Sequence, residues 1–467
     1  MAQTKARKVY RVLQNLAHNE QVSVIMRIKA RPVNEQEASS ALEMLQTERL
    51  ATRRSELLGR ISTRYGEGAE FCKNYRNSRL EAQENIVKEA PKDKVMNLWL
   101  ADAVAVQGTK AELEDLAQHE EVKDVELNST FRIPEILMTP LEDIPGNVDG
   151  SAWGLAQIRA PEVWGGLGRG SGVLVGHLDT GVDATHPALA GKVKCFFDVD
   201  DLGNCTPTAP HDTHYHGTHT AGTICGRSFN GINIGVAPEA MLCSANVLPG
   251  GSGTFAQIIG GMQCLLDAGV HVMNLSLGAI GYSTIWNTAI RTITLAGVPV
   301  VASIGNAGAG TSGGPGNDLF ALGVGATGIG FTRVYKERSF DDVVAGFSSG
   351  ETLVNVPYDL PPFTFFQTYI KPDISAPGVQ TLSAIPGERV AALNGTSMAA
   401  PHVTGAIALV LSAAPSLRDA PGAAFVLRNI LLGAGREDLG EAGRDSRYGF
   451  GRLDALSAAK AAVSLMN

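Results

Sequence analysis

The sequence contains no run of about 18 consecutive apolar residues, so it predicts no membrane-spanning helix. Its first residues include basic side chains, but they lack the apolar stretch of a signal peptide. The chain of 467 residues carries a net charge of −8 and has no basic stripe, which gives no electrostatic reason to expect nucleic-acid binding. These absences predict a cytoplasmic protein that binds neither nucleic acid nor membranes, with secretion by another route left open.

The cysteines are few, and they show neither dense spacing nor a paired CxxC motif. A disulfide framework or a zinc site normally has such spacing, so we expect reduced thiols. The one local pair worth testing as a disulfide is Cys195 with Cys205. The six cysteines are Cys72, Cys195, Cys205, Cys225, Cys243 and Cys264.

Composition divides the chain into two parts. Residues 1–145 contain 21 Lys and Arg and 23 Asp and Glu but only 4 of the 53 glycines, whereas the rest of the chain contains 18 and 24 charged residues. Charge-rich, glycine-poor sequence is typical of helices with a large exposed surface, and glycine-rich apolar sequence is typical of a buried sheet with tight turns. Together with the length, this division predicts two or three domains.

The N-terminal part combines strand-like and helix-like patterns. Residues 35–90 are rich in Glu, Arg, Leu and Ala, which predicts two long helices, and Thr109 with Glu112 forms a capping-box pattern that opens a helix to about His119. Period-two alternation predicts three strands. The expected order is a basic segment at 1–21, strands at 22–30, 98–106 and 122–127 within an α/β domain at 22–132, and a Pro-rich linker at 133–150.

Residues 151–467 predict a different architecture. Near-continuous apolar runs separated by helix-length stretches are typical of a parallel sheet that is covered on both faces. Polar residues that follow such strands should therefore gather at the carboxyl edge of the sheet. The expected strands are 172–178, 241–248, 270–275, 298–304 and 322–325. Residues 331–345 and 353–369 are interpreted as insertions, the second of them as local core cover or a partner interface.

Three motifs in this part supply an acid, a base and a nucleophile. They are Asp179-Thr-Gly, His216-Gly-Thr-His and Asn394-Gly-Thr-Ser397-Met-Ala-Ala-Pro-His. A serine hydroxyl is a weak nucleophile that needs a base, and the base needs a third group to fix its tautomer. Ser397 precedes an apolar helix, whose N-terminus favours developing negative charge. By chemistry alone the base could be His216 or His219.

Two further hypotheses concern the other histidines. The cluster of His211, Asp212, His214 and His216 could be a zinc site, but no HExxH motif supports that interpretation. His177 lies two residues before Asp179 and should point to the same face of the sheet. It is either a hydrogen-bonded core histidine or a residue that tunes the acid.

The order Asp, His, Ser and the residues around each motif resemble the subtilase family from about Trp153 onward, with a weaker resemblance to the family's inhibitory pro-domain before it. The resemblance implies an α/β fold: a subtilisin-like three-layer domain with a mostly parallel sheet, after a small α/β pro-domain with an extended helical insertion. It implies a serine endopeptidase made as a zymogen, with its own pro-domain as intramolecular inhibitor and self-cleavage between about 128 and 151. The substrate would be a protein or peptide.

The same resemblance implies roles for single residues. His216 would be the base, Asp179 its orienting acid, Ser397 the nucleophile and Asn306 the oxyanion donor. The two rims of a substrate cleft would be Gly251, Ser252 and Gly253 on one side and Ser276, Leu277 and Gly278 on the other, with Gly313 at the base of the S1 pocket and Phe255 bordering S4. A pocket floored by glycine should prefer a large apolar P1 side chain.

No cofactor is expected. A structural calcium ion is common in the family, but Ala188 stands where the usual aspartate ligand would be, so that site looks incomplete. Two alternative functions remain at this stage: a pseudoenzyme or binding module on a protease scaffold, and a processing protease dedicated to one partner.

Overall fold

The computed structural model describes residues 12, 21–29, 68–91, 93–133, 138–139, 150–329, 342–360, 363–418, 420 and 422–466. Most of the expected basic segment, the helices expected before residue 68, most of the linker and the greater part of the first insertion lie outside the described residues.

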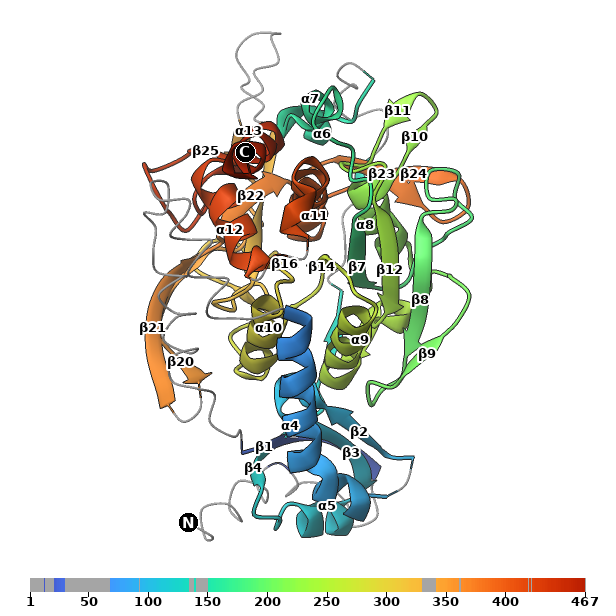
Figure 1. Cartoon of the computed structure of the whole chain (residues 1–467), viewed down its shortest axis with the longest axis vertical. Coiled ribbons are helices and arrows are strands. Elements are labelled where there is room, and N and C mark those ends of the chain that lie inside the picture. The colour runs from blue at the N-terminus through green and yellow to red at the C-terminus, as the bar shows by residue number, and fades with distance from the viewer. Residues whose placement is uncertain are drawn as a thin grey trace.

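The larger part of the molecule is built on an eleven-stranded sheet in which β7 lies next to β12 and β14 (Figure 1). The pairs β7–β12, β7–β14, β14–β16, β16–β18 and β18–β22 are all parallel, which confirms the parallel sheet expected from the apolar runs. All five expected strands lie in it. The sheet contains β7 Leu174–Asp179, β8 Val193–Val199, β9 Cys205–Pro207, β12 Met241–Asn246, β14 Val272–Leu275, β16 Val300–Ser303, β18 Leu322–Ile329, β19 Asp342–Val344, β22 Ile374–Pro377, β25 Arg436–Glu437 and β26 Arg452–Leu453.

Helices cover both faces of this sheet, so the α/β three-layer fold is confirmed. On one face α8 and α11 form a buried cluster with α6, α7 and the C-terminal helix α13. On the other face α9 and α10 pack over the strands. The cluster on the α8 and α11 face is almost wholly aliphatic, whereas the cluster on the α9 and α10 face also contains aromatic side chains, among them Phe255 and Trp286. The helices are α6 Trp153–Gln157, α7 Ala160–Trp164, α8 Tyr215–Cys225, α9 Phe255–Asp267, α10 Ile285–Leu295, α11 Thr396–Ala413, α12 Ala423–Gly433 and α13 Ala455–Met466, with 3-10 turns η4 Pro249–Gly251 and η5 Pro415–Leu417.

The N-terminal part forms a separate four-stranded sheet in the order β2-β3-β1-β4, below α9 and α10 in Figure 1. Thr109 caps the second helix through the predicted capping box with Glu112. The single strand expected at 98–106 is wrong, because a 3-10 turn bends the chain there and Asp102 has a left-handed backbone with φ 49°. The elements are β1 Gln21–Ile28, α4 Gly68–Glu89, β2 Val95–Leu98, η2 Trp99–Ala101, β3 Ala103–Thr109, α5 Lys110–Leu116 and β4 Val122–Leu127.

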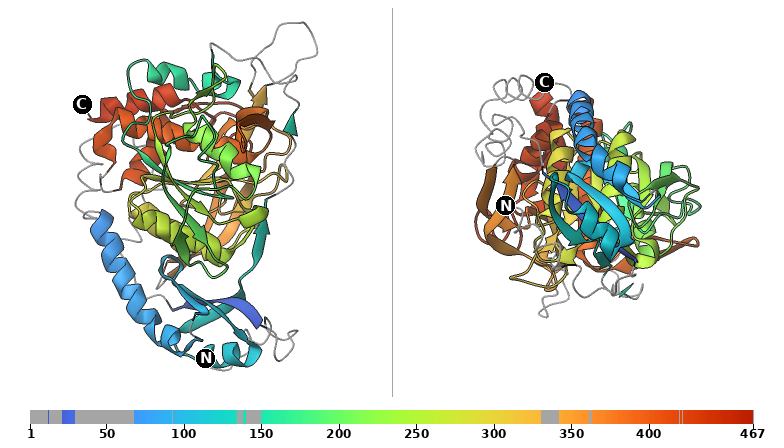
Figure 2. Two further views of the ribbon diagram at one scale, coloured as in Figure 1. Left: turned by 90° about the vertical axis from the view of Figure 1, so that its right-hand side faces the viewer. Right: turned by 90° about the horizontal axis from the view of Figure 1, so that it is seen from below.

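The two parts share a buried interface, seen from two further sides in Figure 2. The turn at Leu98, Trp99 and Leu100 belongs to the same apolar cluster as α9 and α10. Gln263 of α9 fixes that turn, because its amide accepts a hydrogen bond from the Leu100 N–H at 3.2 Å and donates one to the Asn97 carbonyl at 3.2 Å. The bend that interrupts the expected strand is thus what places apolar side chains against the larger part.

Short strands and a hairpin complete the fold. The second insertion is a hairpin in which Tyr358 is buried, with its hydroxyl donating to the Asn287 carbonyl at 3.0 Å, so this part of it covers the core as expected. The remaining strands are β5 Thr130–Arg132, β6 Met138–Thr139, β10 Ser228–Phe229, β11 Ile232–Asn233, β13 Ser252–Thr254, β15 Ala279–Ile280, β17 Gly313–Gly314, β20 Glu351–Leu360, β21 Phe363–Lys371, β23 Thr381–Ile385 and β24 Arg389–Leu393.

Four cysteines form disulfides, so the expectation of reduced thiols is wrong for them. Cys195 pairs with Cys243 and Cys205 with Cys264, and the pair considered from the sequence, Cys195 with Cys205, does not form. Cys195 and Cys243 are opposite one another on adjacent parallel strands, a proximity created by sheet order and not by spacing along the chain. Cys225 is a buried free thiol.

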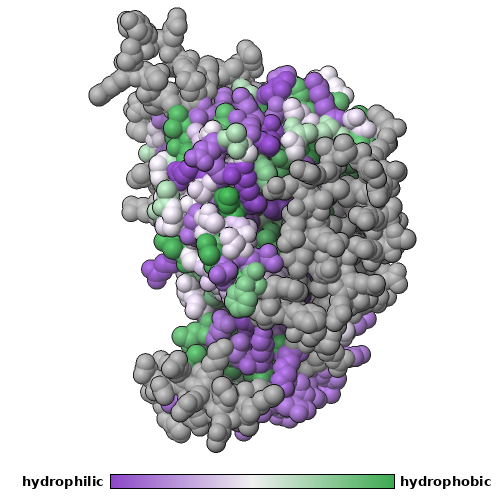
Figure 3. All heavy atoms as spheres, turned by 90° about the vertical axis from the view of Figure 1, so that its left-hand side faces the viewer, coloured by the Kyte–Doolittle hydropathy of each residue, from purple (hydrophilic) through white to green (hydrophobic). Residues whose placement is uncertain are grey.

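One described helix, Thr396–Ala413, is long and apolar enough to cross a membrane, yet 89% of it is buried inside the protein. It is therefore a core helix between the sheet and its neighbours. On the face drawn in Figure 3, the described surface mixes hydrophilic side chains with scattered hydrophobic ones.

Candidate active site

Three neighbouring parallel strands bring the predicted polar residues to one edge of the large sheet. Asp179 is the last residue of β7, Ser276 follows β14, and Asn306 comes shortly after β16. Because these strands are adjacent and parallel, their carboxyl ends share that edge. Two helices begin there as well, with His216 in the first turn of α8 and Ser397 in the first turn of α11.

Asp179 and His216 form a fully buried pair. The Nδ1 of His216 is 2.6 Å from Oδ1 of Asp179, and both side chains have no exposed surface. Asp179 also accepts hydrogen bonds from the Thr180 N–H at 2.8 Å and from the Thr220 hydroxyl at 3.1 Å. Burial alone would raise the pKa of Asp179, but the adjacent His216 and these hydrogen bonds outweigh it and hold that pKa below its ordinary value. The carboxylate is thus ionised and fixed in orientation.

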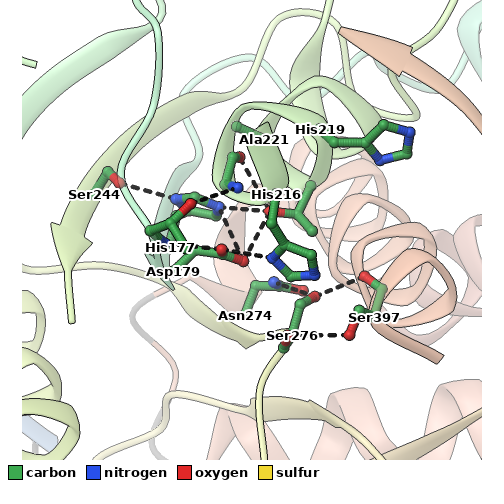
Figure 4. A network of polar contacts seen from close by, with 12 residues as sticks. His177, Asp179, His216, His219, Ala221, Ser244, Asn274, Ser276 and Ser397 are labelled. Carbon is green, nitrogen blue, oxygen red and sulfur yellow. Dashed lines mark hydrogen bonds and ion pairs between the residues drawn. The ribbon is translucent and has the colours of Figure 1, made fainter. Parts of the chain in front are cut away.

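Ser397 lies on the other side of the imidazole (Figure 4). Its hydroxyl donates to the Ser276 carbonyl at 3.1 Å, and its own carbonyl accepts from the Ser276 hydroxyl at 2.8 Å. Nε2 of His216 is buried and has no hydrogen-bond partner among the described residues. The acid–base contact is therefore formed in this structure, whereas the hydroxyl at position 397 is turned toward a backbone carbonyl.

Asn306 is held through one end of its amide. Its Oδ1 accepts from the N–H and from the hydroxyl of Thr396, both at 2.9 Å. With Oδ1 engaged, the amino end must point the other way, and none of the hydrogen bonds between described residues uses Nδ2. Gly395 lies beside it, since a Cβ placed on that glycine would be 3.4 Å from Nδ2.

One predicted rim of the cleft is occupied by the chain's own N-terminal part. Strand β5 pairs antiparallel with β13, so that Ser252 lies opposite Arg132 and Gly253 opposite Phe131. The Ile133 N–H continues the ladder by donating to the Gly251 carbonyl at 2.9 Å. This predicted rim therefore pairs, backbone to backbone, with an extended segment of the same chain.

Phe131 fills an aromatic pocket at this rim. Its ring meets Phe255 edge-on with centroids 4.4 Å apart, and Trp286 lies 5.9 Å from it. Leu277 of the other predicted rim belongs to the same buried cluster. The sequence predicts Phe255 and Leu277 at the cleft but not Trp286, because nothing local to α10 indicates which of its residues will face a strand more than 150 positions earlier.

The second rim lies beside the glycines at 313 and 314. The Gly313 N–H donates to the Ile304 carbonyl at 2.8 Å, and β15 pairs with β17 so that Ala279 lies opposite Gly314. A Cβ on Gly278 would come within 2.7 Å of the Gly314 carbonyl, so only glycine fits at that position. The structure thus places Gly278 against Gly314, and the Ala279 carbonyl lies beside Gly313.

The other histidines near the site have structural partners. His219 Nε2 faces the Thr381 and Ala391 carbonyls at 3.0 and 3.1 Å, and His214 Nδ1 accepts from the His216 N–H at 3.3 Å. Asp212 accepts from the hydroxyls of Thr180 and Thr218. Within the described ranges no group of three or more His, Cys, Asp or Glu side chains is arranged to hold a metal ion, which removes support from the zinc interpretation.

A buried carboxylate–imidazole pair beside a serine at a helix N-terminus is the set of groups that serine hydrolases use. Comparisons with known proteins agree. Residues 170–451 match the model of the subtilase family. The chain is 38% identical over 268 residues to subtilisin Savinase of Lederbergia lenta, covering 56% of this chain and 85% of that protein. It is 36% identical over 264 residues to the major intracellular serine protease of Bacillus subtilis (strain 168), covering 56% and 74%.

The chain therefore belongs to the subtilase family, and it is a subtilisin-like serine endopeptidase that acts on protein or peptide substrates. A third relative, M-protease of Shouchella clausii (strain KSM-K16), is 36% identical over 312 residues, 66% of this chain and 70% of the relative.

Proposed function

We propose that Asp179, His216 and Ser397 form the catalytic triad of this endopeptidase. The observation that carries the proposal is the 2.6 Å contact between the buried Asp179 and His216, with Ser397 at the same edge of the sheet. Asp179 fixes the tautomer in which His216 Nδ1 carries the proton, which leaves Nε2 as the acceptor. When the Ser397 side chain rotates away from the Ser276 carbonyl, its hydroxyl becomes the hydrogen-bond donor to Nε2 of His216.

The reaction then proceeds as acyl transfer. As Ser397 attacks the substrate carbonyl, His216 takes the hydroxyl proton and later gives it to the leaving amine, and water hydrolyses the acyl-enzyme by the same route. The oxyanion is bound by Nδ2 of Asn306 and by the Ser397 N–H, which no helical carbonyl can accept in the first turn of α11. Thr396 supports this arrangement because it holds Asn306 by its oxygen end.

The N-terminal part is proposed to act as an inhibitory pro-domain, with the division 1–21, 22–132, 133–150 and 151–467. Strand β5 occupies the rim at Ser252, and β6 pairs with β24, where Thr139 accepts a hydrogen bond from Asn394 at 3.0 Å. Strand β24 leads into the segment that ends in Ser397, so β6 lies next to the strand that precedes the proposed nucleophile. Self-cleavage is expected within 128–151.

The substrate-binding residues follow from the same pairing. Gly251, Ser252 and Gly253 would bind the substrate backbone as they bind β5, with Ser276, Leu277 and Gly278 on its other side. The aromatic pocket that holds Phe131 would take a large apolar side chain of the substrate. With glycine at position 313, a large apolar P1 residue is the preference we propose.

This mechanism requires no cofactor, because the side chains named supply every proton transfer. At the position of the family's usual calcium ligand, Ala188 is buried and its carbonyl accepts from the Arg227 N–H at 2.9 Å, so we do not propose that site. A cytoplasmic location remains a prediction. The name of the Bacillus subtilis relative supports it, whereas the two disulfides favour an oxidising compartment.

The proposal is tested with wild-type protein and Ser397→Ala side by side. We expect a fluorophosphonate probe to label the wild type at Ser397 only, and mass spectrometry to find a new N-terminus within 128–151 only in the wild type. Failure of labelling would favour the pseudoenzyme. Processing of the Ser397→Ala protein at the same position would show cleavage by another enzyme. A peptide library then separates a general endopeptidase from one dedicated to a single partner.

A further inference from the structure

His177 is a buried histidine that the proposed reaction does not use. It lies on β7 two residues before Asp179, and the period of two in a strand puts both side chains on the face toward α8. Its Nδ1 is 2.9 Å from the Ser244 hydroxyl, and its Nε2 is 2.8 Å from the Thr220 hydroxyl. Thr220 in turn is 3.1 Å from Oδ2 of Asp179. All four side chains have 0% exposure.

Counting hydrogens selects one arrangement of this chain. If Ser244 donates to Nδ1 of His177, then Nε2–H donates to Thr220, and the Thr220 proton is left for Oδ2 of Asp179 or the Gly217 carbonyl, each 3.1 Å from the hydroxyl oxygen. The charged carboxylate oxygen is the stronger acceptor of the two. In the opposite tautomer Thr220 would donate to His177, and Oδ2 of Asp179 would have no donor among the described residues, a costly state for a buried carboxylate oxygen. The negative charge of Asp179, 4.0 Å from Nε2, also attracts a proton to that nitrogen.

We propose that His177 is a positioning residue which, as the Nε2–H tautomer fixed by Ser244, directs the Thr220 hydroxyl onto Oδ2 of Asp179. The inference rests on the proposed triad. With Oδ2 bound by Thr220, the carboxylate cannot rotate, and Oδ1 stays aligned with Nδ1 of His216. The donated hydrogen bond also withdraws part of the carboxylate charge from His216.

Few charged groups face this chain of hydrogen bonds. They are Asp179 on the same strand, Asp212 in the loop before α8, and His216 on α8. The neighbouring strands present neutral groups, Ser244 from β12 and Asn274 from β14, and α9 packs on the opposite face. Burial lowers the pKa of His177, so this histidine is neutral near neutral pH. Its own titration therefore adds no step there to the dependence of kcat on pH.

Thr220→Val tests the inference, because it replaces the hydroxyl with a methyl group of similar size. We expect kcat to fall about tenfold with little change in KM, since one charge-assisted hydrogen bond is lost in a preorganised site. The acid limb of the kcat profile should move to higher pH by about half a unit, because an unshielded carboxylate stabilises the imidazolium of His216 more strongly. Thr220→Ser should restore both. Ser244→Ala should produce a smaller shift in the same direction.

Thr223→Val is the matched control. Thr223 lies on the same helix and is equally buried, but its hydroxyl donates to the His219 carbonyl at 3.1 Å and does not bond to Asp179. Equal pH profiles and kcat values for Thr220→Val and Thr223→Val would overturn the inference. If Thr220→Val does not fold, an unchanged profile in Ser244→Ala overturns it. A wild type that the fluorophosphonate probe does not label would instead overturn the triad itself, so the two failures are distinguishable.

Discussion

The two halves of the proposed active site differ in how far the fold has already arranged them. In the acid–base half, Asp179 and His216 are fully buried and bonded at 2.6 Å, and the carboxylate also accepts hydrogen bonds from Thr180 and Thr220. In the nucleophile half, the Ser397 hydroxyl is bonded to the Ser276 carbonyl, and the N-terminal part occupies the neighbouring rim. A rigid acid–base pair and a serine that must turn would suit the proposed zymogen, because folding then builds the electrostatic arrangement and only a side-chain rotation remains.

Asp179→Asn, in the acid–base half, should cause the largest loss of activity. The amide leaves the geometry in place but cannot hold His216 in the productive tautomer, so we expect kcat to fall by on the order of 10⁴, the size known for the equivalent change in another serine protease. Kinetics with a small peptide substrate measure it. Asp183→Asn is the control, since that carboxylate binds Thr185 and the Gly387 N–H instead. Comparable losses in both variants would argue against a special role for the acid–base half.

Asn306→Ala sharpens the account of the nucleophile half. Removal of the amide donor should lower kcat by roughly 10² to 10³ with KM nearly unchanged, a size known for subtilisin, because the donor acts on the oxyanion and not on the bound substrate. Asn306→Asp, which keeps the acceptor for Thr396 but loses the donor, should be at least as impaired. Full activity in the aspartate variant would show that this side chain only holds Thr396.

Each half also carries a buried neutral histidine on the same helix as its reactive residue, His219 three positions after His216 and His402 five positions after Ser397. Burial lowers the pKa of His219 to about 3 and that of His402 to about 4. The unfolded chain binds a proton at each near pH 6.5, so stability is complete above that pH and falls as the pH drops toward 4. The loss is about 3 kcal/mol for each histidine.

Urea unfolding of the Ser397→Ala protein, which cannot digest itself, measures this loss between pH 7 and pH 4. His402→Asn keeps a donor for the Met398 carbonyl, and His219→Gln keeps one for the Thr381 carbonyl. Each variant should show a shallower dependence of the unfolding free energy on pH. An unchanged slope in both would mean that other groups cause the acid sensitivity.

Phe131→Ala should have the smallest effect. The ring is 8% exposed and fills the pocket of Phe255 and Trp286, so its loss should weaken docking of β5 at the cleft. We expect the fluorophosphonate probe to label the uncut chain about tenfold faster, as for loss of a buried aromatic anchor. Mass spectrometry separates uncut from processed chains. Arg132→Ala, on the exposed side of the same strand, should label at the wild-type rate, and equal acceleration in both would remove the pocket from the explanation.

Much of the larger part could be predicted from sequence. The apolar runs before Asp179 and after residue 270 identify strands because a sheet covered on both faces must be apolar on both. Local patterns failed to predict the structure where contacts between distant segments of the chain determine it. The turn at Trp99 interrupts a pattern that is otherwise strand-like, because its side chains pack on α9. Cys195 pairs with Cys243 on the adjacent strand β12, and Cys205 pairs with Cys264 on helix α9, so both disulfides depend on how distant segments pack.

The sequence by itself determined that an acid follows a strand and that a base and a serine lie near the starts of helices. Local signals suffice for this, because the hydrophobic period and the residues that begin a helix are read from neighbouring positions in the chain. Only the tertiary structure decided that Ser276, Thr396, Trp286 and Thr220 complete the surroundings of those groups. Such partners come from elements far apart in the chain, and their contacts arise when the order of parallel strands and the packing of helices bring those elements together.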